Sequence, residues 1–135
     1  MLTTARASTE SRTLNREKFD LALKNFKLLH ELGSDATQPN SYTYDFFLKA
    51  CRNLLPDSET RQSLAEKAFK LCQQKGLVTA EICVETYRLS PKFVMRVLDT
   101  SGKSNEAASA VIPDKWCVNV PQRFRERRVD FPILY

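Results

Sequence analysis

The sequence predicts an all-α fold of stacked helical hairpins, an α-solenoid, and three observations support this prediction. An apolar pattern in steps of four, three and four residues ends in Gly and occurs twice, as Ala22, Phe26, Leu29 and Gly33 and again as Ala65, Phe69, Cys72 and Gly76. The spacing places its first three positions on one helix face and the Gly where helices commonly end. The chain has only three Gly among 135 residues, which fits helices better than a turn-rich β fold. A recurring helix with the same packing face and the same stop indicates a helical repeat.

Caps and apolar stripes place the elements along the chain. The predicted elements are, in order, a polar leader at 1–14, a helix over 15–33 capped by Asn15, a loop over 34–40, a helix over 41–54, a helix from Ser58 to Gly76, a short helix from Thr79 to Tyr87, and a helix that begins at Ser90 and Pro91. Residues 99–106 are expected to form a loop, and no β-hairpin signal is found. The expected organisation is a flexible leader at 1–14, helical repeats over 15–80, a divergent helical C-terminal cap over 81–120 and a basic tail over 121–135.

Composition limits the classes of function. The hydrophobic fraction of 42% allows one modest core, and the net charge of +5 permits contact with an anionic polymer such as a nucleic acid. No stretch approaches the roughly 18 consecutive apolar residues of a membrane span, so no membrane partner is expected.

The sequence offers no catalytic or metal-binding constellation. Its four cysteines have no CxxC spacing and its only histidine is His30, so buried, reduced thiols are expected and no metal or cofactor is predicted. The patterns HExxH, GxSxG and the phosphate-binding loop are missing. We therefore expect a binding protein and not an enzyme.

The segment 41–76 resembles a pentatricopeptide repeat. Its first helix, S-Y-T-Y-D-F-F-L-K-A-C, is similar to the family pattern V-V-T-Y-N-x-L-I-x-A-C. Its second helix is similar to A-x-x-x-F-x-x-M-x-x-x-G, and the earlier copy of the apolar pattern looks like the second helix of a preceding repeat. The loops are longer than in the family, so the resemblance, which covers about residues 15–80, is to a divergent, loop-extended form. Because the chain begins at a second helix, the expected context is the C-terminal end of a repeat array.

The resemblance implies sequence-selective binding of single-stranded RNA along the face lined by the first helices. In the family, the fifth residue of a repeat and the last residue before the next repeat read the base; these correspond to Asp45 with Ala80 and, for the preceding repeat, to Asn40. The resemblance also favours RNA processing, stability or translation in a mitochondrion or plastid. The residues expected to contact RNA are Asn40, Tyr42, Asp45, Lys49 and Arg52, together with Arg123, Arg125, Arg127 and Arg128 in the basic tail.

The same positions leave a second interpretation open. Ala80 has no side-chain hydrogen-bonding group and cannot read a base edge, and the carboxylate of Asp45 would repel phosphate. A helical-repeat scaffold that binds protein is therefore the alternative, and a truncated gene product without independent function is a third interpretation. For the single residues, the alternative roles are packing for Tyr42, a solvated face for Lys49 and Arg52, and a soluble tail for the arginines.

Overall fold

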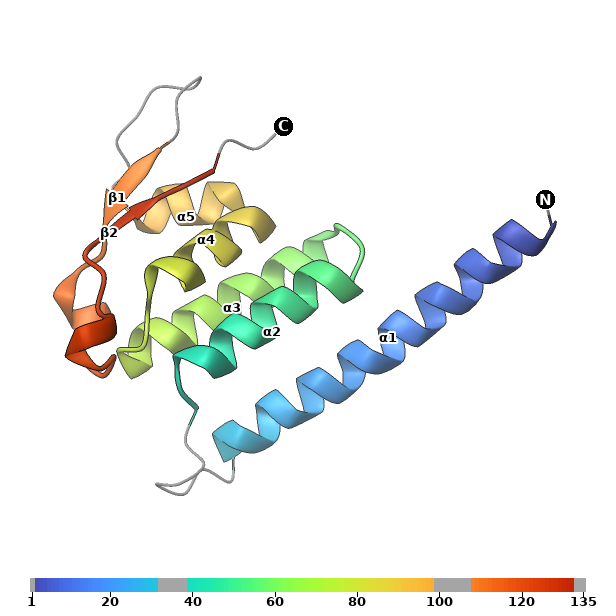
Figure 1. The fold of residues 1–135 in the computed structure, drawn as a ribbon, viewed down its shortest axis with the longest axis horizontal. Coiled ribbons are helices and arrows are strands. Elements are labelled where there is room, and N and C mark those ends of the chain that lie inside the picture. The colour runs from blue at the N-terminus through green and yellow to red at the C-terminus, as the bar shows by residue number, and fades with distance from the viewer. Residues whose placement is uncertain (1, 32–38, 99–107, 133–135) are drawn as a thin grey trace.

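The computed structural model describes residues 2–31, 39–98 and 108–132, with side chains from Arg12 onward, and it is mainly helical (Figure 1). Its helices are α1 (Leu2–Glu31), α2 (Ser41–Leu54), α3 (Glu59–Lys75), α4 (Ala80–Leu89) and α5 (Pro91–Val97). They are followed by strand β1 (Ser109–Val111), the 3-10 turns η1 (Asp114–Trp116) and η2 (Gln122–Phe124), and strand β2 (Arg128–Asp130). The predicted all-α class is confirmed at the level of a mostly helical chain.

Local capping signals explain where α2, α3 and α4 begin. Asn40 and Thr43 form a capping box at the start of α2, in which each side chain accepts a hydrogen bond from the other residue's backbone N–H at 3.1 Å. Ser58 caps α3 and Thr79 caps α4 without a reciprocal bond: in each case the side-chain oxygen accepts a hydrogen bond from a backbone N–H of the first turn. These starts are confirmed. Ser90 precedes α5 as predicted, although its side chain makes no capping hydrogen bond.

The first helix begins earlier than the sequence pattern predicts. The helix start predicted at Asn15 is wrong, because α1 already begins at Leu2. No Pro or Gly interrupts the chain between Leu2 and Glu31, so polar composition alone does not stop the helix. The predicted stop at Gly33 and the predicted loop over 99–106 lie outside the described residues.

The C-terminal region is not wholly helical, which corrects the expectation of a helical cap without strands. Strands β1 and β2 pair antiparallel, with Ala110 opposite Val129. Each strand has three residues, too few for an alternating pattern to stand out in the sequence. The sheet is held by packing, since Val129 and Phe131 are buried and the ring of Phe131 lies 4.7 Å from that of Tyr87 on α4. The described part of the basic tail therefore contributes to the core.

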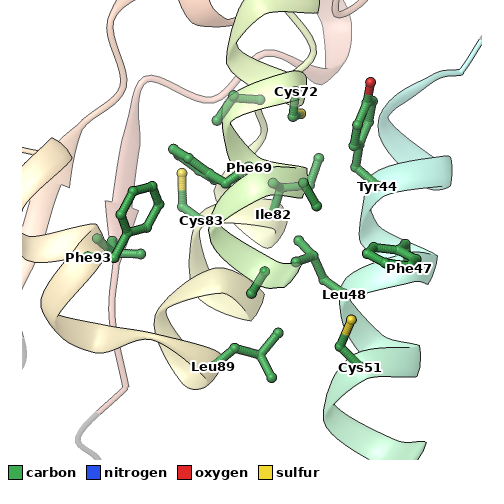
Figure 2. Packing of buried hydrophobic residues seen from close by; sticks show 14 of the residues in the cluster. Tyr44, Phe47, Leu48, Cys51, Phe69, Cys72, Ile82, Cys83, Leu89 and Phe93 are labelled. Carbon is green, nitrogen blue, oxygen red and sulfur yellow. The ribbon is translucent and has the colours of Figure 1, made fainter. Parts of the chain in front are cut away.

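Helix α2 lies at the centre of the packing, in contact with α1, α3 and α4. The ring of Phe47 stacks on that of Phe26 from α1 at 4.2 Å, and Tyr44 is fully buried. Figure 2 shows side chains from α2 facing those of α3 and α4 across a continuous apolar interior. Tyr44 also meets His30 of α1, whose Nε2 lies 2.8 Å from the Tyr44 hydroxyl. The buried face of α2 thus joins three helices.

A backbone clamp joins the end of α3 to the C-terminal region. The N–H of Asn119 donates to the carbonyl of Gly76 at 2.8 Å, and its side-chain amide donates to the carbonyl of Lys75 at 2.7 Å. The N–H of Val78 donates to the carbonyl of Trp116 at 2.9 Å. We call these three bonds the Gly76 clamp; they satisfy backbone groups that the end of a helix leaves open.

Gly76 provides a sharp test of this arrangement. It ends α3 in the left-handed conformation, with φ of 66°, and an added Cβ would lie 2.7 Å from Cγ2 of Val118. We expect Gly76→Ala to lower the free energy of unfolding by about 2 kcal/mol, from backbone strain and this close contact. Urea denaturation measures the change. Adding Val118→Ala should recover part of the loss, whereas a Gly76→Ala chain as stable as the wild type would contradict the assignment.

The four cysteines are free and buried, as predicted. Burial raises the pKa of the Cys51 thiol to about 12 and that of Cys83 to about 12, and it also raises the pKa of Cys72. Only the thiolate is alkylated readily, and an ordinary thiol has a pKa of about 8.5.

We therefore expect iodoacetamide at pH 8 to modify Cys51, Cys72 and Cys83 at least about 100-fold more slowly in the folded chain than in urea. Mass spectrometry of the modified peptides against time measures the rates. The same reagent and pH with the chain unfolded serves as the control, and equal rates in both states would contradict the burial of these thiols.

Candidate nucleic-acid interface

The exposed side of α2 carries two aromatic rings. Tyr42 and Phe46 lie one helical turn apart and are 79% and 70% exposed. Lys49 and Asn53 continue the same face at helical spacing. We call Tyr42, Phe46, Lys49 and Asn53 the α2 ridge. Of its members, the sequence pattern selected Tyr42 and Lys49 as candidate RNA contacts but not Phe46 or Asn53, for which packing or a solvated face is the simpler interpretation; the four-residue step from Tyr42 to Phe46 is the signal that places both rings on one face.

Asp45, the expected base reader, is held beside the ridge by Lys49. The Lys49 ammonium lies 2.9 Å from Oδ2 of Asp45 and 3.2 Å from a carboxylate oxygen of Glu81 on α4. The hydrogen bond to Asp45, and to a smaller extent the one to Glu81, raises the pKa of Lys49 above its ordinary value, so the ammonium remains charged. The second carboxylate oxygen of Asp45 is buried and has no hydrogen-bond partner in the described part of the chain. Asp45 therefore faces the α2–α4 contact.

Arg52 also faces α4, where it meets Glu85. Its Nε and Nη2 donate to the two carboxylate oxygens of Glu85 at 3.0 and 3.3 Å, a two-pronged geometry that strengthens a charged hydrogen bond. Glu85 is only 3% exposed. A glutamate on the apolar face of α4, next to Ile82 and Thr86, was a signal in the sequence that a basic partner must exist.

Asp45, Lys49, Arg52, Glu81 and Glu85 thus form one group, which we call the α2–α4 ion-pair network. Oxygens of its three carboxylates lie within 4.8 Å of one another. Carboxylates at this spacing suit a divalent cation, but here Lys49 already pairs with Asp45 and Glu81, and Arg52 pairs with Glu85. With one more carboxylate than cations, the network leaves the surface beside the ridge slightly acidic.

The two remaining positions of the expected base-reading code lie at helix starts. Asn40 uses its side-chain oxygen to cap α2. Ala80 is the first residue of α4 and contributes no polar group. The capping role occupies the side-chain oxygen of Asn40, and Ala80 has no side-chain group that could read a base edge.

The arginines of the basic tail belong to the C-terminal region. Arg125 is structural, since its guanidinium donates to the carbonyls of Val120 and Val118 at 2.8 and 2.7 Å. Arg123 lies over the ring of Phe124 at 4.7 Å. Arg127 and Arg128 form exposed ion pairs with Asp114 and Asp130. Among the described residues, no hydrogen bond or ion pair joins these arginines to the α2 ridge, so the two expected RNA-contacting sets are separate.

The Arg52–Glu85 pair should be the most costly ion pair to break. Arg52→Ala leaves a buried carboxylate without its cation, and we expect the free energy of unfolding to fall by about 1–3 kcal/mol. Arg16→Ala, which removes the exposed pair with Asp20 on α1, should change it by less than about 0.5 kcal/mol. Thermal and urea denaturation of both variants measure the contrast, and equal effects would show that Glu85 does not depend on Arg52.

Within the described residues, no helix has the length and apolar character that crossing a membrane requires.

Comparisons with known proteins do not identify a family for this chain. Searches against family models, curated proteins and solved structures found no match. The resemblance to pentatricopeptide repeats therefore rests on the residues of 41–76 and their spacing.

Proposed function

We propose that this chain is a non-catalytic helical-repeat module that binds single-stranded RNA on the α2 ridge. The observation that carries the proposal is the pair of exposed rings, Tyr42 and Phe46, one turn apart on the same face. Stacking of a base on an aromatic ring contributes about 1–3 kcal/mol and accepts any base. Two such rings form a platform that suits unstacked bases of a single strand.

The packing of the helices supports the repeat interpretation. Helix α2 contacts α3 and also α4, which in the proposed repeat arrangement would take the place of the first helix of a following hairpin. In stacked hairpin repeats, first helices lie side by side in this way and together form the ligand-binding face. The pentatricopeptide resemblance assigns RNA to the same face, and it suggests a role in RNA processing, stability or translation.

The ion-pair network changes what kind of RNA binding we propose. Lys49 and Arg52 are neutralised by carboxylates, so few counterions would leave when phosphate approaches. The carboxylate of Asp45 pairs with Lys49 and the side-chain oxygen of Asn40 caps α2, which reduces the hydrogen-bonding groups available for base reading. The proposed binding therefore depends on stacking, is weakly selective for sequence, and weakens little with salt.

A second candidate function is binding of a basic protein segment. The specific observation in its favour is the excess of carboxylates next to the ridge, with Glu81 exposed. Exposed Tyr and Phe beside acidic groups can anchor a peptide that carries Lys or Arg, since aromatic residues are enriched at protein interfaces.

Fluorescence anisotropy with a labelled single-stranded RNA of mixed sequence tests the RNA proposal. We expect Tyr42→Ala and Phe46→Ala each to weaken binding roughly 10-fold, the loss of one stacked base. Phe124→Ala removes a comparably exposed ring from the C-terminal region and is the matched control, with no expected change. A salt series should give a slope near that of about one or two phosphate contacts.

Three outcomes would contradict the proposal: no binding at low salt, equal effects of Phe46→Ala and Phe124→Ala, or equally tight binding of duplex RNA. A Lys-rich peptide that binds the wild type and loses affinity in Tyr42→Ala, without RNA binding, would support the second candidate instead.

A further inference from the structure

An apolar groove lies between α1 and α3, and none of the α2 ridge residues line it. Its volume is about 270 Å³. The apolar side chains that line it come from three helices and are Leu23 and Phe26 of α1, Phe47 of α2, and Leu64, Ala68 and Leu71 of α3.

The groove exists because α1 packs on α2 and only loosely on α3. The chain buries Phe26, Phe47 and Ala68 almost completely at the bottom of the groove. Leu23, Leu64 and Leu71 pack against the same core but remain only half-buried. Covering these three leucines would gain roughly 25 cal/mol for each Å² of apolar surface removed from water.

Two lysines give the groove its charge. Lys27 lines it from α1 and Lys67 from α3, so a cation stands on each wall. Both are exposed, and neither forms an ion pair within the described residues. Glu31 also lines the groove, which leaves the lining with one net positive charge. The cations of the α2–α4 ion-pair network are neutralised, whereas these two are available to a carboxylate.

The size of the groove favours protein side chains over a cofactor. Small-molecule sites usually enclose about 300–1,000 Å³, and this groove lies at the lower end of that range and is open between two helices instead of enclosed. A helix that lies in such a groove inserts apolar residues spaced at i, i+3 or i+4, and i+7.

We propose that the groove between α1 and α3 docks an amphipathic helix of a partner protein whose leucine-type residues are flanked by Asp or Glu. The apolar residues would cover Leu23, Leu64 and Leu71, and the carboxylates would meet Lys27 and Lys67. This interaction is separate from the proposed RNA surface, so the chain could hold both ligands at once.

The test uses the full chain and two labelled helical peptides with the same leucines. One peptide carries Glu beside the leucines and the other carries Lys at the same positions. We expect the Glu peptide to bind the wild type at least about 10-fold more tightly than the Lys peptide in an anisotropy titration. In the variant Lys27→Glu/Lys67→Glu, this preference should reverse.

Lys92→Glu, an equal charge change per residue at an exposed site on α5, is the matched control and should leave the preference unchanged. Near-UV circular dichroism checks that each variant keeps the wild-type fold.

Failure of the Glu peptide to bind, or an unchanged preference in the double variant, overturns the proposal. The proposal is also overturned if the apparent molecular mass of the wild type rises with protein concentration and that of the double variant does not, because this would assign the groove to a second copy of the chain. Loss of RNA affinity in the double variant without peptide binding would assign the lysines to RNA and likewise overturn it.

Discussion

The packing of α2 against α1, α3 and α4 is the constraint on which the rest of the structure depends. Tyr44, Phe47, Leu48, Ala50 and Cys51 are buried, so about half of the helix surface is in contact with its neighbours. The packing of this buried side, shown in Figure 2, also fixes the position of the α2 ridge on the opposite side of the helix. A platform that is held in place in this way needs little ordering when it meets a ligand, and ordering is a main cost of binding.

Some of the basic side chains are paired within the fold and others are left unpaired. Glu85 is buried on α4 and is tolerated because Arg52 reaches it from α2, which favours one relative position of the two helices. Lys49 joins the same two helices through Asp45 and Glu81. Lys27 and Lys67, which line the groove between α1 and α3, form no ion pair within the described residues. The surface beside the α2 ridge therefore has one more carboxylate than cations, whereas the lining of the groove between α1 and α3 has one net positive charge.

Sequence reasoning succeeds where structure follows from local chemistry. Asn40, Ser58 and Thr79 sit directly before helices, and Gly76 directly after one, so α2, α3 and α4 could be placed closely from the sequence. The reasoning fails where distant residues decide. Strands β1 and β2 exist because Val129 and Phe131 pack on the body of the fold. Arg52 and Glu85 are 33 residues apart, so no spacing rule within one helix could pair them. Of the α2 ridge, the sequence pattern selected Tyr42 and Lys49, and it gave no indication of the ion pairs that Lys49 and Arg52 form with carboxylates of α2 and α4.

The Gly76 clamp affects how the chain unfolds. In an array of hairpins, each unit contacts only its neighbours, so unfolding can begin at an end and proceed one hairpin at a time. Here Asn119 is bonded to Lys75, 44 residues away, and the sheet region is buttressed by α4 (Figure 1). Closing this long connection slows folding, because its loop entropy is lost before the contacts form. The same contacts link α3, α4 and the sheet region, so that the region from β1 to β2 cannot separate from the helices without breaking the Gly76 clamp and the contact between Tyr87 and Phe131.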